Sequence, residues 1–211
     1  MARYPIFLNL QGKRAVVIGA GPVAARKVRG LAEAGARVVV VAPHFGSAFE
    51  TSCSGPNVEL IESTYAKEYL AEALLCIAAT NDRTLNQRIY DDCQTREVLC
   101  NVVDTPELCD FYVPALVRRG PLQIAISTDG YCPAYAGHVR EQLEEMFTEL
   151  HGRFVEALEQ ARCRVIERVP DANDRKVLMG EMVRGESFDY FAEHGRDAWQ
   201  ARIDDMIREH T

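Results

Sequence analysis

The chain has 211 residues, 47% of them hydrophobic and 26% charged, and its formal net charge is −7 at pH 7. This composition supports a packed core and excludes global disorder, and the length suits one large domain or two small ones. No apolar run reaches the roughly 18 residues that cross a bilayer, so we expect no membrane protein. The acidic balance argues against a general nucleic-acid binder.

The N-terminal residues and the cysteines both indicate a cytoplasmic protein. Residues 1–6 include no long apolar segment of the kind that forms a signal peptide. The seven cysteines are odd in number and no pair has CxxC spacing, which disfavours zinc sites and a disulfide framework. We therefore expect reduced thiols, with Cys76 and Cys100 as small core residues inside apolar runs.

Short β-branched runs alternate with helical patterns over the first hundred residues. Strands separated by helices predict an α/β fold with a Rossmann-like parallel sheet and right-handed crossovers. The predicted strands are residues 15–18, 37–41, 58–61, 74–79 and 98–103, and the predicted helices are residues 23–34 and 84–94.

The pattern changes after Asp104. One more strand is predicted at residues 122–126, preceded by a turn or loop at Arg118-Arg119-Gly120-Pro121. From Pro133 onward apolar residues recur at helical spacing, which predicts an all-helical C-terminal third.

The segment Gly19-Ala20-Gly21-Pro22-Val23-Ala24 follows the first predicted strand and opens the first predicted helix. In this GxGxxA pattern the first glycine allows a tight turn and the second lets the backbone approach a pyrophosphate. The small final residue allows the helix and the strand to pack closely. Because a helix N-terminus also offers free N–H groups to phosphate, the pattern predicts a dinucleotide site. The alternative is a tight turn that binds nothing.

The acidic residue that usually ends the second strand and holds the adenosine ribose is missing. The chain has Val41-Ala42-Pro43-His44 there, with no carboxylate and no arginine for a 2′-phosphate. The ribose contact is then left to the backbone or to His44, unless His44 is simply an exposed loop residue. This loop does not decide between NAD and NADP.

Several blocks, in order along the chain, resemble the precorrin-2 dehydrogenase family. That family includes the N-terminal part of multifunctional sirohaem synthases and free-standing dehydrogenase/ferrochelatases. Together the blocks cover about residues 1–150 and are more specific than the glycine pattern alone. They are Tyr4–Leu10, Val17–Lys27, Ala78–Asp82, Asn86–Gln87, Cys100–Asp104 and Ala125–Gly130.

The resemblance implies an oxidoreductase that uses NAD to convert precorrin-2, a tetrapyrrole rich in carboxylates, into sirohydrochlorin for sirohaem biosynthesis. Some members also act as ferrochelatases, so a lyase activity that inserts Fe²⁺ or Co²⁺ is left open. Members form homodimers. The implied parts are an NAD-binding Rossmann-like domain at residues 1–113, a dimerisation segment at 114–150 and a helical domain at 151–211.

The resemblance also implies site residues, most of them at the carboxyl ends of predicted strands, where an open parallel sheet places its ligands. For the cofactor these are Gly19, Ala20, Gly21, Pro22, Val23, Ala24, Pro43, His44, Thr80, Asn81, Asn101 and Val102. For the substrate, Thr128 is implied by the match. A polyanion also needs cations, and we predict Arg118, Arg119 and Arg140, although most surface arginines are merely solvated.

Asp104 is the residue that the family makes central to catalysis and to metal handling. It follows the apolar run 98–103, so its carboxylate can face the ligand cleft and accept a proton as a hydride leaves. It is also the candidate for transient ligation of a metal ion. The alternative is that Asp104 caps the turn before Thr105-Pro106.

Two segments, Thr128-Asp129-Gly130 and Cys132-Pro133, depart from the family pattern, which often has a second glycine and a serine before the proline. Asp129 is either a carboxylate near the cleft or a turn residue, and Cys132 is either a soft ligand or a small side chain. His138 is either an aid to proton or metal transfer or a surface histidine. These departures bear on chelatase activity more than on dehydrogenation.

A second hypothesis is a regulatory module that senses NAD without catalysis. Such modules share the glycine pattern but usually keep the acidic residue at the end of the second strand. Its absence here, and the blocks after residue 78, favour the enzyme.

Overall fold

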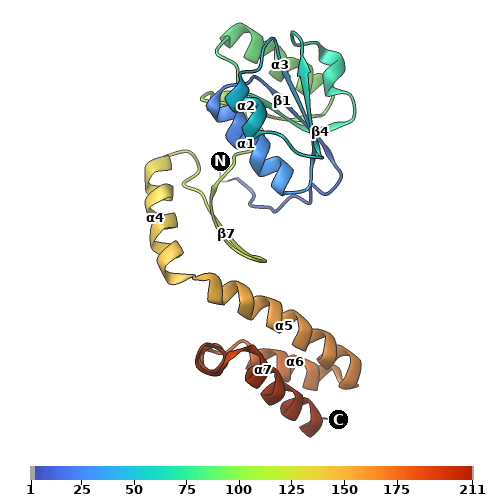
Figure 1. The fold of residues 1–211 in the computed structure, drawn as a ribbon, viewed down its shortest axis with the longest axis vertical. Coiled ribbons are helices and arrows are strands. Elements are labelled where there is room, and N and C mark those ends of the chain that lie inside the picture. The colour runs from blue at the N-terminus through green and yellow to red at the C-terminus, as the bar shows by residue number, and fades with distance from the viewer. Residues whose placement is uncertain (1–2, 211) are drawn as a thin grey trace. The chain divides into compact units, whose positions relative to one another are not determined.

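The computed structural model describes residues 3–210, and the chain divides into two compact units, Met1–Val113 and Pro114–Thr211 (Figure 1). The first unit is α/β and the second consists mostly of helices. The predicted Rossmann-like sheet and helical C-terminal part are therefore confirmed. Within the described residues no helix combines the length and apolar character that a bilayer crossing requires.

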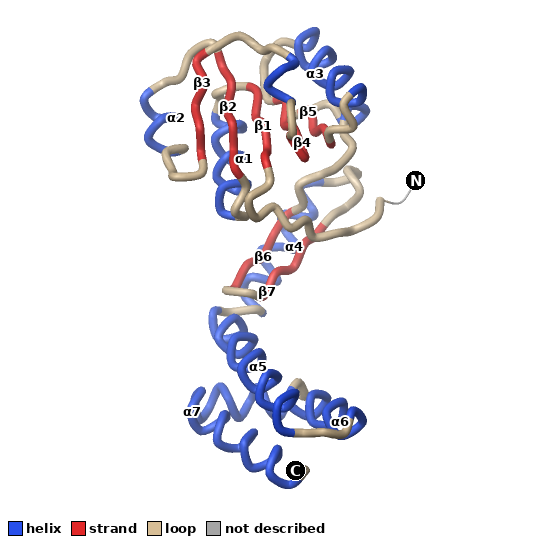
Figure 2. The backbone as a smooth tube through the Cα atoms, turned by 90° about the vertical axis from the view of Figure 1, so that its right-hand side faces the viewer, coloured by secondary structure: helices blue, strands red, loops and turns tan. Residues whose placement is uncertain are grey.

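A five-stranded parallel sheet with strand order β3-β2-β1-β4-β5 forms the centre of the first unit (Figure 2). Its strands are β1 (Arg14–Ile18), β2 (Arg37–Ala42), β3 (Val58–Glu62), β4 (Ala73–Ala78) and β5 (Leu99–Val102). The helices between them are α1 (Pro22–Glu33), α2 (Ser47–Ser52) and α3 (Arg83–Thr95), with short 3₁₀ turns η1 (Lys67–Leu70) and η2 (Pro106–Leu108).

Helices cover both faces of this sheet, which explains its continuous apolar strands. Five of the six residues of β2 are buried. Val28 of α1 and Phe49 of α2 pack on one face, whereas Ile89 and Cys93 of α3 pack on the other. The sequence did not predict α2 or η1, because both are too short to display a helical period.

Three buried thiols lie between the sheet and α3, and the predicted core placement of Cys76 and Cys100 is confirmed. Cys76 pairs with Cys100 in the register of β4 and β5. Hydrogen bonds with Cys100 and Cys93, together with burial, raise the pKa of Cys76. This thiol therefore stays protonated at neutral pH and acts as packing.

The second unit begins with a hairpin. The predicted turn is present at Gly120 and Pro121, but Arg118 and Arg119, which were expected in the same turn or loop, are the last residues of strand β6 (Ala115–Arg119), which pairs antiparallel with β7 (Leu122–Ile126). A charged pair before Gly-Pro is typical of a loop. However, Val117 is buried and its neighbour Arg118 is exposed, which is the alternation of a strand with one covered face. The turn itself lies at Gly120, where φ is +52°.

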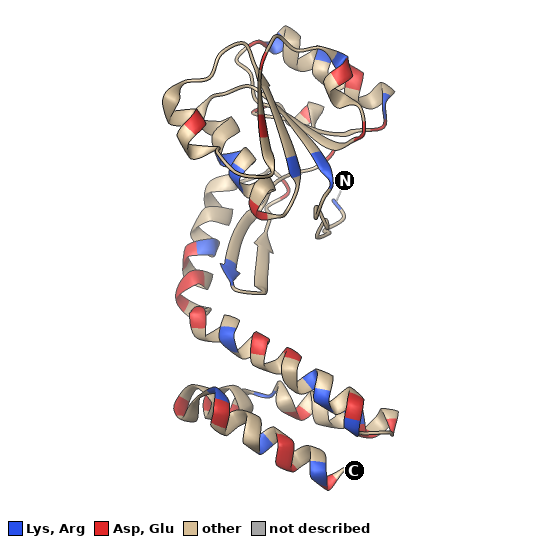
Figure 3. Ribbon diagram, turned by 45° about the vertical axis from the view of Figure 1, so that its right-hand side comes forward, with Lys and Arg blue, Asp and Glu red and all other residues tan. Residues whose placement is uncertain are grey.

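The rest of the second unit is helical. Its helices are α4 (Pro133–Met146), α5 (Glu149–Arg168), α6 (Ala172–Met182) and α7 (Gly185–Glu209). Trp199 of α7 is fully buried, its ring lies 5.4 Å from that of Phe154 on α5, and its Nε1–H donates to Oγ of Ser187 at 2.8 Å. Acidic and basic residues are interspersed along α5 and α7 (Figure 3), and some of them pair within a helix, as Arg162 does with Glu159.

Candidate functional site

The carboxyl ends of three neighbouring strands lie at one edge of the sheet. Ala78, the last residue of β4, pairs with Ile18 of β1 on one side and with Val102 of β5 on the other. The strands are parallel, so the segments that follow them emerge at the same edge. These segments are the glycine loop (residues 19–24), residues 80–81 and Asp104.

The glycine loop has the backbone geometry that its sequence predicts. Gly19 has φ of +118°, and a Cβ there would lie 2.4 Å from the carbonyl oxygen of Ala79, so no other residue fits. Gly21 is the N-cap of α1, and no atom lies within 4 Å of a Cβ built on it. The first turn of α1 has no side-chain cap and no acidic residue. Its N-terminal N–H groups are thus open to an anion.

Thr80 is held by a buried amide that was not among the predicted site residues. Its Oγ1 donates to Oδ1 of Asn86 at 2.6 Å, and Nδ2 of Asn86 donates back to the carbonyl of Thr80 at 3.0 Å. Asn86 is only 6% exposed, so this pair fixes the path of the loop. Asn81 is exposed, and Asp82 caps α3 through the N–H groups of Thr84 and Leu85.

Asn101 and Val102, two predicted cofactor residues, are both buried in β5. Nδ2 of Asn101 donates to the carbonyl of Phe111 at 2.9 Å and to Sγ of Cys109 at 3.4 Å. The Asn101 side chain therefore fastens residues 109–111 beside the strand. Its structural contribution is to position this edge of the site.

Asp104 is exposed, and its carboxylate forms no hydrogen bond or ion pair with the described residues. Its φ is +59°, a left-handed conformation that is uncommon outside glycine but that aspartate tolerates better than most residues. Asp104 lies in a turn that the N–H of Thr105 closes on the carbonyl of Val102 at 3.3 Å, as the alternative expects, but it caps no helix, since the N-cap of η2 is Thr105. Asp129 has the same left-handed conformation in another turn, so this backbone geometry alone does not mark a functional position.

Pro43 and His44 follow β2, and both are exposed. The Nδ1–H of His44 donates to Oε1 of Glu62, the last residue of β3, at 2.9 Å. No local pattern indicates this pair, because His44 follows β2 whereas Glu62 ends β3, 18 positions along the chain.

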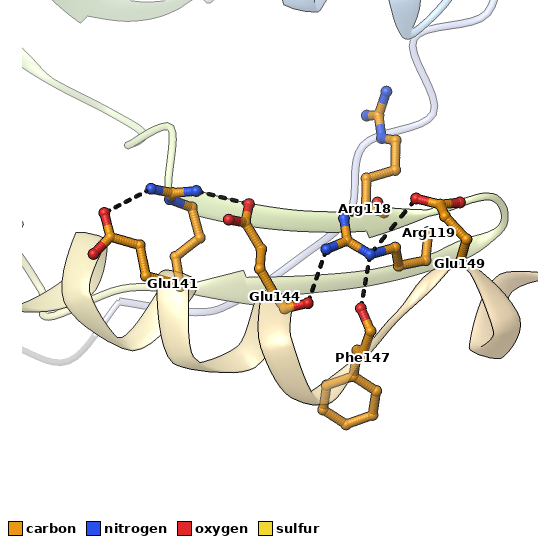
Figure 4. Close-up of polar contacts among 7 residues, drawn as sticks. Arg118, Arg119, Glu141, Glu144, Phe147 and Glu149 are labelled. Atoms are coloured by element: carbon orange, nitrogen blue, oxygen red, sulfur yellow. Dashed lines mark hydrogen bonds and ion pairs between the residues drawn. The ribbon is translucent and has the colours of Figure 1, made fainter.

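Arg118 and Arg119, the predicted substrate cations of β6, differ in their surroundings (Figure 4). Arg119 donates from Nε to the carbonyl of Phe147 at 2.7 Å and from Nη2 to that of Glu144 at 3.0 Å. It thereby satisfies carbonyls at the end of α4. Arg118 is exposed and points away from α4.

Arg140, the third predicted cation, is held on its own helix. Its guanidinium contacts Glu144 at 2.7 Å and Glu141 at 3.2 Å (Figure 4). Two carboxylates thus offset much of its charge before any anion arrives.

Thr128 closes a turn before α4. Its Oγ1 accepts from the N–H of Cys132 at 3.1 Å, and its carbonyl accepts from that of Tyr131 at 2.9 Å. Asp129 within this turn has φ of +54°, as expected for a turn residue. Cys132 and His138 are exposed. Within residues 3–210 no three His, Cys, Asp or Glu side chains gather as a ready metal site.

Two family models match the chain. Residues 6–115 match the family described as putative NAD(P)-binding, and residues 119–146 match the central part of sirohaem biosynthesis proteins. In fold, the chain is similar to the solved structure of SirC, a precorrin-2 dehydrogenase, with a TM-score of 0.78 at 22% identity over 96% of this chain and all of that one.

Curated relatives are longer than this chain. The siroheme synthase of Psychrobacter cryohalolentis is 34% identical over 185 residues, which are 88% of this chain and 35% of that protein. The siroheme synthase of Pseudomonas aeruginosa is 36% identical over 206 residues, 98% of this chain and 43% of that protein. The chain therefore spans less than half the length of these relatives.

Proposed function

The chain belongs to the family of putative NAD(P)-binding proteins, and on this premise we propose that it is a precorrin-2 dehydrogenase that uses NAD to form sirohydrochlorin for sirohaem biosynthesis. One observation carries the proposal: the glycine loop and the unpaired carboxylate of Asp104 emerge at the same edge of one parallel sheet. Removing a hydride and a proton from precorrin-2 requires an acceptor for each.

The residues at this edge fit a dinucleotide. The close approach of Gly19 to Ala79 keeps the turn tight, and the open space above Gly21 admits a diphosphate. The N–H groups of Val23 and Ala24, in the uncapped first turn of α1, would hold that diphosphate. When bound, the nicotinamide of NAD takes up the hydride. The segments 43–44, 80–81 and 101–102 would flank the cofactor.

Asp104 would take the proton. Its carboxylate is exposed and uncommitted, so it can reach a substrate held at this edge and act as general base. Arg118, Thr128 and Arg140 are proposed contacts of the substrate carboxylates. Arg119 and Arg140 are weaker candidates than predicted, since the Arg119 guanidinium binds carbonyls at the end of α4 and two glutamates offset much of the charge of Arg140.

The test is an anaerobic incubation of the purified chain with NAD and precorrin-2, followed by absorbance. Formation of NADH and sirohydrochlorin in equal amounts is the expected result. NAD binding without any oxidation of a competent substrate would instead support a sensing module.

Metal insertion and dimerisation belong to the same proposal. The free carboxylate of Asp104 is placed to accept a pyrrole proton as Fe²⁺ or Co²⁺ enters sirohydrochlorin. Chelation faster than the uncatalysed background is expected, and equal rates would restrict the chain to dehydrogenation.

Light scattering is expected to give the mass of a homodimer, twice the 23.6 kDa of the chain.

A further inference from the structure

We propose that Glu62, at the end of β3, supplies the carboxylate that β2 lacks and makes the cofactor site selective for NAD over NADP. This inference rests on the proposed function, since it concerns the adenosine half of the same nucleotide site. It assigns to a residue of the neighbouring strand a role that usually belongs to the last residue of β2.

The register of the sheet places Glu62 where such a carboxylate is needed. Glu62 pairs with Ala42, the last residue of β2, and the N–H of Ser63 donates to the carbonyl of Ala42 at 2.9 Å. The C-terminal ends of β2 and β3 are therefore level. A long side chain from the end of β3 can reach the position that the end of β2 leaves without an acid.

The carboxylate of Glu62 is held in place by a hydrogen bond from His44. The Nδ1–H of His44 donates to Oε1 of Glu62 at 2.9 Å, which leaves the second carboxylate oxygen available to another donor. Both side chains are well exposed, at 83% for His44 and 60% for Glu62, so a ribose can reach them. A carboxylate accepts hydrogen bonds from the two ribose hydroxyls of NAD.

The same carboxylate disfavours NADP, because a 2′-phosphate would bring a second anion against it. Discrimination against NADP depends on such repulsion as much as on attraction to NAD. No lysine or arginine occurs in residues 41–46 or 61–66 to offset the phosphate charge.

The experiment compares the full chain with its E62Q variant by calorimetry, using NAD, NADP, 5′-AMP and 2′,5′-ADP as ligands. The last two differ only in the 2′-phosphate, so they report on the ribose without any contribution from the nicotinamide. The matched control is E59Q, which makes the same change at another exposed residue of β3. Glu59 precedes Glu62 by three positions, an odd number, so its side chain lies on the opposite face of the sheet.

We expect the wild type and E59Q to bind NAD at least about tenfold more tightly than NADP, and E62Q to reduce this ratio to about threefold or less. Equal ratios in E62Q and the wild type, or a wild type that prefers NADP, would overturn the inference while leaving a working nucleotide site. Failure of the wild type to bind any of the four ligands would instead overturn the proposed function.

Discussion

The two units of the chain present polar residues in opposite ways. In the first unit, two candidate groups at strand ends are unsatisfied: the N–H groups of the glycine loop lack a cap and the carboxylate of Asp104 lacks a partner among the described residues. In the second unit, Arg119 and Arg140 already have internal partners. A charged side chain alone is therefore a poor sign of a binding residue. An unsatisfied group held by rigid elements is a better one.

The strongest test of the first unit is Gly19→Val. Its side chain would meet the Ala79 carbonyl, which lies 2.4 Å from an ideal Cβ, and φ of +118° is strained for any L-residue. We expect NAD affinity to fall at least about a hundredfold or the unit to unfold, as measured by calorimetry and circular dichroism. Gly30→Ala is the control, because its site in α1 is open. It should leave NAD binding intact and raise stability by about 0.5–1 kcal/mol.

Asp104→Asn should lower turnover by about a hundredfold, the low end of what general base catalysis contributes. Asparagine also tolerates the left-handed backbone, so the fold and NAD affinity should be unchanged. Glu97→Gln is a matched control, because Glu97 is another exposed carboxylate with positive φ, +56°, but precedes β5 at the opposite edge. Full turnover in Asp104→Asn would remove the proton-acceptor role.

The two arginines of β6 sharpen the comparison within the second unit. Arg119→Ala should lower the free energy of unfolding by about 1–3 kcal/mol, because carbonyls at the end of α4 lose their donor, and should leave the KM for precorrin-2 nearly unchanged. Arg118→Ala should raise that KM severalfold with little loss of stability. Steady-state kinetics measures the KM of each variant and urea unfolding measures its stability. A raised KM in Arg119→Ala together with a loss of stability in Arg118→Ala would exchange the roles of the two residues.

The smallest expected effect is on the acid stability of α6. The N–H groups of Asp174 and Asn173 lower the pKa of Asp171, which caps this helix. A carboxyl group whose pKa is lower in the folded state stabilises the fold fully at pH values above its unfolded pKa of about 3.9. This contribution to the free energy of unfolding is lost as the pH falls through the lower pKa of the folded state. Asp171→Asn keeps a capping acceptor. It should slightly flatten the pH dependence of unfolding, and an unchanged profile would contradict the assignment.

The strands of the first unit, in their succession along the chain, and the glycine loop were predictable because they depend on local patterns. Buried parallel strands are recognisable in a sequence as apolar runs. The backbone conformation at position 19 requires glycine, so its sequence signal is also local. Asn86 and Glu62 could not be found in this way. Their importance comes from partners on other segments, Thr80 and His44, which only the folded chain brings within hydrogen-bond distance.

Strand β6 escaped prediction, and helix α6 was not delimited within the region predicted to be helical, for a different physical reason. In β6 the alternation is short and ends in two arginines, so turn chemistry dominates the local pattern. In α6 only Leu178 and Met182 are buried, and so narrow an apolar stripe gives a weak helical period.

A structure of the chain determined with NAD would locate the cofactor relative to the glycine loop and Asp104. We expect the diphosphate to lie against the N–H groups of Val23 and Ala24 and the nicotinamide to lie at the sheet edge that carries Asp104. A nucleotide bound elsewhere, or a glycine loop without ligand at saturating NAD, would contradict the proposed site.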